Sequence, residues 1–164
     1  MAIVLKSKSE LEKMRAANVV VCTVLDEVER MVKPGITTWD LEARAREMVQ
    51  EFKVRPAFLG YGDPPFPAVC CISPNEEVVH GIASKDRVLV EGDIVSVDFG
   101  VEKDGYYGDS ARTIAVGKVS KTAQKLMDLT REALERAINN CEVGKRLNDV
   151  SRAVQGHVEE NGFS

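Results

Sequence analysis

The 164-residue sequence predicts an α+β fold in which an antiparallel sheet is backed by helices. Apolar residues recur at helical spacing near both ends of the chain. Between them, runs of β-branched and aromatic residues predict strands, and Asp104-Gly105 favours a two-residue hairpin turn. Because such a hairpin typically buries one face, helices packed on that face would complete a hydrophobic core.

Length, composition and charge narrow the class of protein. The chain is 44% hydrophobic and 29% charged, which is ordinary for one globular domain. Its net charge of −4 gives no general attraction to nucleic acid or anionic lipid. No apolar run is long enough for a signal peptide or a membrane segment, and the cysteines at 22, 70, 71 and 141 fit neither a zinc pattern nor a disulfide framework. We therefore expect a cytoplasmic protein that binds neither nucleic acid nor membrane.

The first predicted helix runs from Ser9 to Val32 and ends at Pro34-Gly35. A second helix begins near Thr38, because Thr37 and Asp40 form a capping box. The residues expected to face the core are Leu11, Met14, Val21, Val24, Leu25, Val28 and Met31 in the first helix and Leu41, Ala45, Met48, Val49 and Phe52 in the second.

Residues 55–68 are predicted to form an ordered or semi-ordered loop, because they hold four of the six prolines together with three aromatic residues. The strands expected after this loop cover residues 69–73, 77–82, 93–102 and 106–116.

Two further helices are predicted, from Ser120 to Cys141 and from Asn148 to about Glu160. They faintly repeat the first pair at an offset of 109 residues, a likeness that two helix pairs can also show by chance. If the repeat is real, residues 9–117 form one complete unit, and residues 120–164 begin a second.

The predicted hairpin places two carboxylates on one face. With Asp104-Gly105 as the loop, Asp98 pairs with Ala111 and Gly100 pairs with Asp109, so the aspartates are diagonal neighbours with Cβ atoms roughly 7 to 8 Å apart. Paired acids in a hollow need a neutralising partner, and their oxygens suit Mg, Mn, Fe, Co or Zn. The alternative is that both aspartates are surface residues on an exposed face of the hairpin. The prediction also depends on register, because a slip of one residue would move Asp109 to the opposite face.

Three segments carry a resemblance to a known family: NEEVVHGI at 75–82, EGDIVSVDFGV at 91–101 and DGYYGDSARTIAVG at 104–117. In their order and spacing they resemble the methionine aminopeptidases of the bacterial type I form, and the likeness covers the whole chain. The resemblance implies the pseudo-two-fold pita-bread fold. The chain, residues 1–164, would be a single N-terminal portion of the catalytic domain, with the first half of that fold and the first two helices of the second.

The resemblance also implies an activity, namely hydrolytic removal of the initiator methionine from nascent proteins near the ribosome. Asp98 and Asp109 would ligate two divalent metal ions (Co, Mn, Fe, Ni or Zn), which bridge a water and lower its pKa. His80 would be a catalytic residue that contacts the substrate and assists proton movement without ligating a metal.

A pocket for the methionine side chain is implied around Cys71, Tyr61 and Phe66, since sulfur and aromatic groups suit a thioether. Without the resemblance, Cys71 would be interpreted as a small buried hydrophobic residue of a strand. Phe58 stands where many bacterial relatives have a small or sulfur-containing residue, which leaves the size of this pocket open.

The sequence departs from the family at its end. Family members use two Asp, one His and two Glu as metal ligands, and the last three come from the second half. The sequence ends at Ser164, before the expected Gly-His-Gly segment, and His157 is expected to be a solvated helix residue rather than a ligand. We therefore expect a truncated form that binds metal weakly or not at all and has little or no activity. The full-length form is expected to be a monomer, whereas the truncated form could self-associate.

Two other functions stay open. One is an Xaa-Pro peptidase of the same fold, although such relatives usually carry an additional N-terminal domain. The other is a non-catalytic scaffold or peptide-binding member, which truncation favours and retention of His80, Asp98 and Asp109 opposes.

Overall fold

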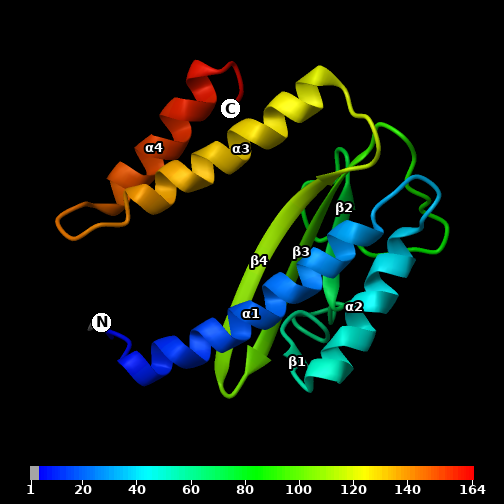
Figure 1. Ribbon diagram of the computed structural model, residues 1–164, viewed down its shortest axis with the longest axis horizontal. Coiled ribbons are helices and arrows are strands. Elements are labelled where there is room, and N and C mark those ends of the chain that lie inside the picture. The colour runs from blue at the N-terminus through cyan, green and yellow to red at the C-terminus, as the bar shows by residue number, and fades with distance from the viewer. Residues whose placement is uncertain (1–3) are drawn as a thin grey trace. The chain divides into compact units, whose positions relative to one another are not determined.

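The computed structural model describes residues 4–164 and divides into two compact units, the first ending at Lys118 and the second beginning at Val119. Figure 1 shows their elements. The first unit contains α1 (Lys8–Met31), α2 (Thr38–Phe52), β1 (Arg55–Pro56), β2 (Cys70–Pro74), β3 (Ile94–Lys103) and β4 (Tyr106–Ala115). The second contains α3 (Lys121–Asn139) and α4 (Leu147–Glu160). The predicted α+β class, an antiparallel sheet backed by helices, is confirmed.

β3 is the central strand of the sheet. It pairs with β4 along its whole length on one edge, and its other edge is shared by β2 and β1. All pairings are antiparallel, and Lys103 pairs with Tyr106 across the two-residue turn. The register predicted for the hairpin is therefore confirmed.

One face of the sheet packs against α1, which crosses the β3–β4 hairpin (Figure 1). The inward side chains of β3 are fully buried there, as predicted from their alternation. At the crossing, a Cβ on Gly108 would lie 2.7 Å from the backbone of Ala17 and Asn18, so glycine is required for this close approach. The buried core residues of these two elements are Val21, Val24, Leu25 and Val28 in α1 and Val95, Val97, Phe99 and Val101 in β3.

α2 is joined to the sheet by a buried carboxylate. Glu42 accepts hydrogen bonds from the backbone N–H groups of Val69 and Cys70 at 2.8 and 3.0 Å, and Arg46 donates to it at 2.7 Å. The pairing with Arg46 and two amide donors offsets the cost of burying this charge. The start of β2 is thereby held in place.

Both helices of the first unit begin at a capping box, of which only the one at α2 was predicted. Thr37 and Asp40 form the predicted capping box of α2, and Ser7 and Glu10 form a second one at α1. Two predicted core residues, Leu11 and Phe52, are instead exposed.

The strand predicted at 77–82 is wrong. This segment has no regular structure, because Asn75 and His80 both adopt left-handed backbone conformations that interrupt an extended chain. Its apolar residues Val78 and Val79 are exposed. The loop predicted at 55–68 is irregular except for β1, which adds two residues to the edge of β3.

In the second unit, α3 and α4 pack against each other. The expectation that His157 is solvated is wrong, since only 7% of this residue is exposed. Its Nε2 lies 3.0 Å from Glu132 Oε2, at ion-pair distance but without the alignment of a hydrogen bond. Across residues 4–164, the helices are too short or too polar to cross a membrane.

The first turn of α1 provides a test of how the hairpin is held. The Ser7 N–H donates to Glu10 Oε2 at 2.7 Å, and the Tyr106 hydroxyl donates to Glu10 Oε1 at 3.0 Å. The hydrogen bonds from Ser7, followed by the one from Tyr106, lower the pKa of Glu10 from 4.5 to about 2. A lowered pKa stabilises the folded state above pH 4.5, and this contribution is lost as the pH falls toward 2.

We expect Glu10→Gln to lower the urea midpoint of unfolding at pH 7, with the deficit shrinking as the pH falls from 4.5 toward 2. The midpoint can be followed by the fluorescence of Trp39. Glu12→Gln is the control, because Glu12 makes only an exposed ion pair with Arg15. A deficit that is the same at every pH would contradict this role for the Glu10 charge.

Candidate functional site

The two aspartates meet on the outer face of the β3–β4 hairpin. Asp98 pairs with Ala111 and Asp109 pairs with Gly100, so the aspartates are diagonal neighbours in the observed register. Asp98 is half-buried and Asp109 is exposed. Their carboxyl groups lie within hydrogen-bond reach of each other, which means that the side chains converge on one point.

This convergence changes the acidity of Asp98. Burial, the negative charge of Asp109 and a hydrogen bond to Asp109 raise the pKa of Asp98 from 3.8 to about 6, and the nearby His80 acts in the opposite direction. Two carboxylates this close repel each other when both are ionised. A cation between them would relieve that repulsion, so the pair has the electrostatic character of an incomplete cation site.

Cys71 lies beside the carboxylates because β2 pairs it directly with Asp98. The residue is buried, and the backbone N–H of His80 donates to its sulfur. Burial, and then the charge of Asp98, raise the pKa of the Cys71 thiol to about 11. The thiol is therefore neutral at physiological pH and forms a soft, uncharged wall next to the acids.

The position of His80 depends on the glycine that follows it. Gly81 accepts a hydrogen bond from the N–H of Ile72 at 2.9 Å and donates to Ser73 Oγ at 3.0 Å. A Cβ at Gly81 would lie 2.1 Å from the Ile72 carbonyl oxygen, so no other residue fits. This contact holds His80, which is exposed and has a φ of 59°, against β2 close to the carboxylates.

Phe58 covers the sheet next to Asp109. Its ring would lie 3.1 Å from a Cβ placed on Gly100, the residue that pairs with Asp109, and Ala57 approaches the same point at 3.2 Å. The absence of a side chain at Gly100 lets this aromatic ring rest on the carboxylate face of β3.

Tyr61 and Phe66 lie on the proline-rich loop. Phe66 donates its N–H to the Tyr61 carbonyl at 2.8 Å, and Gly60 donates to the Phe66 carbonyl at the same distance. These bonds bring the two aromatic residues together. Within residues 4–164, no hydrogen bond links either of them to the carboxylates, and Tyr61 is 78% exposed. Their part in a methionine pocket stays a prediction.

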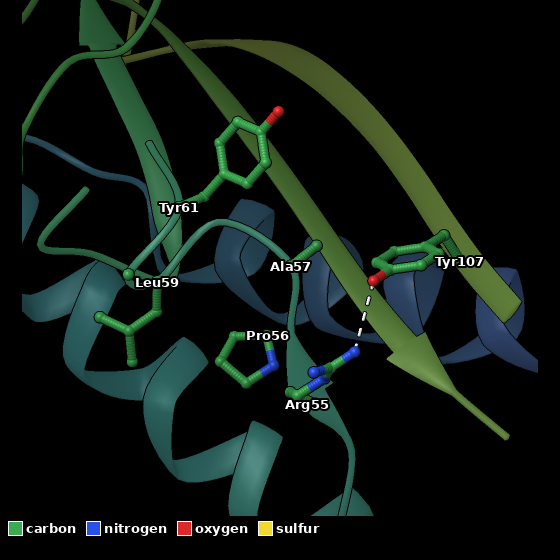
Figure 2. Close-up of a pocket in the computed structure, with 7 residues that line it drawn as sticks. Arg55, Pro56, Ala57, Leu59, Tyr61 and Tyr107 are labelled. Carbon is green, nitrogen blue, oxygen red and sulfur yellow. Dashed lines mark hydrogen bonds between the residues drawn. The ribbon is translucent and has the colours of Figure 1, made fainter. Parts of the chain in front are cut away.

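A hollow that the sequence did not indicate lies beside this loop. It has a volume of about 380 Å³ and is lined by residues 55–57, residues 59–61 and Tyr107. In Figure 2, the rings of Tyr61 and Tyr107 lie on either side of Ala57, and Arg55 reaches the Tyr107 hydroxyl. Tyr107 shares a strand face with Asp109, two residues away, and this spacing is the signal in the sequence that could have pointed to it.

The donor set fits part of a metal centre. Two adjacent carboxylates are the hard oxygen ligands that divalent cations accept. Across the part of the chain that is described, no cluster of three or more His, Cys, Asp or Glu side chains has the geometry to hold a metal ion. Asp98 and Asp109 could therefore supply one side of such a centre, while tight binding requires further donors.

Comparison with known proteins gives consistent matches. The model of metallopeptidase family M24 matches residues 12–164. Methionine aminopeptidases from Aquifex aeolicus and Clostridium acetobutylicum are 49% and 45% identical over 99% and 98% of this chain, and the matches cover 65% and 64% of those relatives. The chain thus spans slightly less than two thirds of their length.

Solved structures with similar folds include the same family of enzymes. The methionine aminopeptidase of Thermotoga maritima has a TM-score of 0.93 and 44% identity, over 98% of this chain and 64% of that one. The Xaa-Pro dipeptidase of Bacillus anthracis has a TM-score of 0.80 over 96% of this chain and 42% of that one. Because the two are only 21% identical, this likeness shows the fold alone.

The Gly81 contact yields a prediction for the site. We expect Gly81→Ala to destabilise the protein by about 1 to 3 kcal/mol, because the new methyl group forces residues 80–81 away from β2. Urea unfolding measures the loss, and the amide NMR spectrum should show shifts at Cys71 and His80. Gly156→Ala is the matched control, since its Cβ would meet open space on α4. A Gly81→Ala variant as stable as the wild type would contradict this account.

Proposed function

The chain belongs to metallopeptidase family M24, and we propose that it carries one side of the active centre of a methionine aminopeptidase. It has the antiparallel sheet and helices of the pita-bread fold. The reaction proposed is hydrolytic removal of the initiator methionine from newly made proteins. The observation that carries the proposal is the convergence of Asp98 and Asp109 on one face of the hairpin.

Sequence identity favours this activity over the Xaa-Pro alternative. The relatives that are 39% to 49% identical to the chain are methionine aminopeptidases. The Xaa-Pro enzymes and prolidases among the structural neighbours are only 19% to 22% identical. A non-catalytic scaffold would have no need to keep two mutually repelling carboxylates together, because this arrangement destabilises the metal-free fold.

In the proposed function, Asp98 and Asp109 hold divalent cations, with Co, Mn, Fe, Ni and Zn as the candidates. When bound, these ions would supply Lewis-acid activation of the attacking water and of the scissile carbonyl. A free amino terminus in its neutral form would be a further ligand for such an ion, which suits an enzyme that removes the first residue.

The remaining residues would position the substrate. We assign to His80 the contact with the peptide and the movement of a proton, supported by its place beside Cys71 and Asp98. The neutral Cys71 thiol would form one wall of the methionine pocket, and Tyr61 and Phe66 would supply its aromatic part. The exposure of Tyr61 leaves its ring available for such a contact.

The proposal extends to where the protein acts and to its assembly. All four cysteines are free thiols, which supports a reducing cytoplasm where nascent chains emerge from the ribosome. We further propose that residues 1–164 form the N-terminal portion of the catalytic domain and that the full-length form is a monomer. The outer edge of β4 pairs with no strand of residues 4–164, and such an edge allows the 164-residue chain to self-associate.

Metal binding by the isolated chain tests the site. We expect Mn²⁺ to broaden the amide NMR signals around Asp98 and Asp109, and Asp98→Asn to weaken this binding roughly tenfold or more, because one of two charged donors is lost. Asp93→Asn is the control. Asp93 is also a hydrogen-bonded carboxylate, but its partners are Asn75 and the Val90 N–H. Broadening centred elsewhere, or unchanged in Asp98→Asn, would remove the basis of the proposal.

Catalysis by the 164-residue chain is expected to be near background, because two carboxylates alone form an open and weak site. The assay is hydrolysis of Met-Ala-Ser in the presence of Mn²⁺, beside a complete methionine aminopeptidase, with EDTA-treated chain as the blank. Turnover close to that of the complete enzyme would show that the two carboxylates suffice and that the expected weakness is wrong.

A further inference from the structure

The outer edge of β4 is a free hydrogen-bonding edge next to the carboxylates, since β4 pairs with β3 on one side only (Figure 1). On the other side of β3, the Gly100 carbonyl accepts a hydrogen bond from the Ala57 N–H at 2.9 Å, so the backbone of Gly100 points away from β4. Hydrogen-bonded and non-hydrogen-bonded pairs alternate along an antiparallel ladder. Asp109, which pairs with Gly100, therefore directs its own N–H and C=O to the free edge.

The same direction holds for every second residue of β4. The residues whose backbone groups point outward are Tyr107, Asp109, Ala111, Thr113 and Ala115. Within residues 4–164, none of these backbone groups has a backbone partner. An unpaired edge of this length is a template for another strand, and proteins commonly block such edges with a charged side chain. In this set the one charged side chain is Asp109, which the proposed function assigns to a metal ion.

A second copy of β4 fits this edge about a two-fold axis. With the axis at Ser110, Asp109 of each copy lies opposite Ala111 of the other, on the same face of the joined sheets. The two Asp109 residues are then diagonal neighbours with Cβ atoms roughly 7 to 8 Å apart. Asp98 and Asp109 already have this relation within one hairpin.

The neighbouring registers serve the carboxylates less well. Moving the axis to Asp109 puts the two Asp109 side chains directly opposite each other, where like charges destabilise the pairing most. Moving it to Ala111 separates them by about 13 Å along the strand, which is too far for a shared ion. The axis at Ser110 is therefore the register in which a cation can join the two copies.

This register gathers four carboxylates, namely Asp98 and Asp109 of both copies, in one row across the joined sheets. Without a cation their charges repel one another, so the metal-free chains gain little from pairing. Divalent cations reverse this balance, because each ion obtains oxygen donors from both copies. A single chain lacks such a donor set, since residues 4–164 contain no cluster of three or more side chains able to hold a metal ion.

From these observations we propose that the 164-residue chain forms a two-fold dimer through the free edges of β4 when a divalent cation is bound. The second copy completes the metal centre with its own Asp98 and Asp109. This proposal rests on the proposed function, because it takes the two aspartates as metal ligands. Metal binding and dimerisation then form one linked equilibrium, in which each promotes the other.

Sedimentation equilibrium of the chain, with Mn²⁺ or with EDTA, tests the dimer. A reductant is present throughout, because the exposed thiols of Cys22 and Cys141 could otherwise cross-link two copies. We expect a monomer in EDTA and a dimer in Mn²⁺. The apparent Kd for Mn²⁺ should also fall roughly tenfold or more as the chain concentration rises through the range in which the dimer forms, because the dimer binds the ion more tightly.

Ala111→Pro blocks the edge without removing a carboxylate. Proline is tolerated in an edge strand when the lost N–H faces outward, as it does at Ala111, and its ring prevents a second strand from pairing there. This variant should stay monomeric in Mn²⁺, while the amide NMR signals around Asp98 and Asp109 still broaden. Ala115→Pro is the matched control. Its N–H also points outward, but Ala115 lies beyond the segment that pairs about Ser110, so this variant should dimerise like the wild type.

Circular dichroism verifies that each variant is folded. Where Ala111→Pro does not fold, Thr113→Pro provides the same block, because Thr113 pairs with Tyr107 of the second copy in this register. A Thr113→Pro variant that dimerises like the wild type would refute the proposed edge.

The outcomes separate this proposal from the proposed function. A chain that binds Mn²⁺ at Asp98 and Asp109 but stays monomeric at every concentration refutes the dimer and leaves the proposed function standing. A dimer already present in EDTA, or one that forms equally well in Ala111→Pro, also overturns the proposed dimer. If Mn²⁺ causes no broadening around the two aspartates, both proposals fail.

Discussion

The strict pairing of β3 with β4 across a two-residue turn is the constraint on which the site depends. Side chains alternate along a strand, so a slip of one residue would move Asp109 to the face that packs on α1. Gly108 reinforces the register from the other side, because only a glycine allows the close approach of the α1 backbone. The core therefore holds the hairpin in the one alignment that brings the two carboxylates together.

A second set of contacts brings β2 to the same place. Glu42 holds the start of β2 through two backbone amides, and pairing with β3 then puts Cys71 opposite Asp98. The close packing of Gly81 on Ile72 adds His80 to the group. The charged residue Glu42 on α2 thus serves the site without touching it, and its burial is compensated by Arg46 and the amides it binds.

In the resulting group, the carboxylates of Asp98 and Asp109 repel each other, and Asp109 is exposed to solvent. Asp98 has a raised pKa because it is partly buried and lies near Asp109, so both carboxylates are more easily ionised together when a cation is close. The neutral Cys71, the exposed His80 and the ring of Phe58 lie beside the two carboxylates. The chain's length, about two thirds that of its relatives, agrees with a donor set that supplies one part of a metal centre.

The elements that depend on neighbours in the sequence were predictable: the capping box of α2, both helix pairs, the Asp104-Gly105 turn and the diagonal placement of Asp98 and Asp109. Periodicity and turn chemistry encode them within a few residues. The irregular segment at His80, the burial of His157 and the hollow at Tyr107 arise only in the folded chain. Each joins residues that are distant in the sequence, and no local pattern records which of them the packing brings into contact.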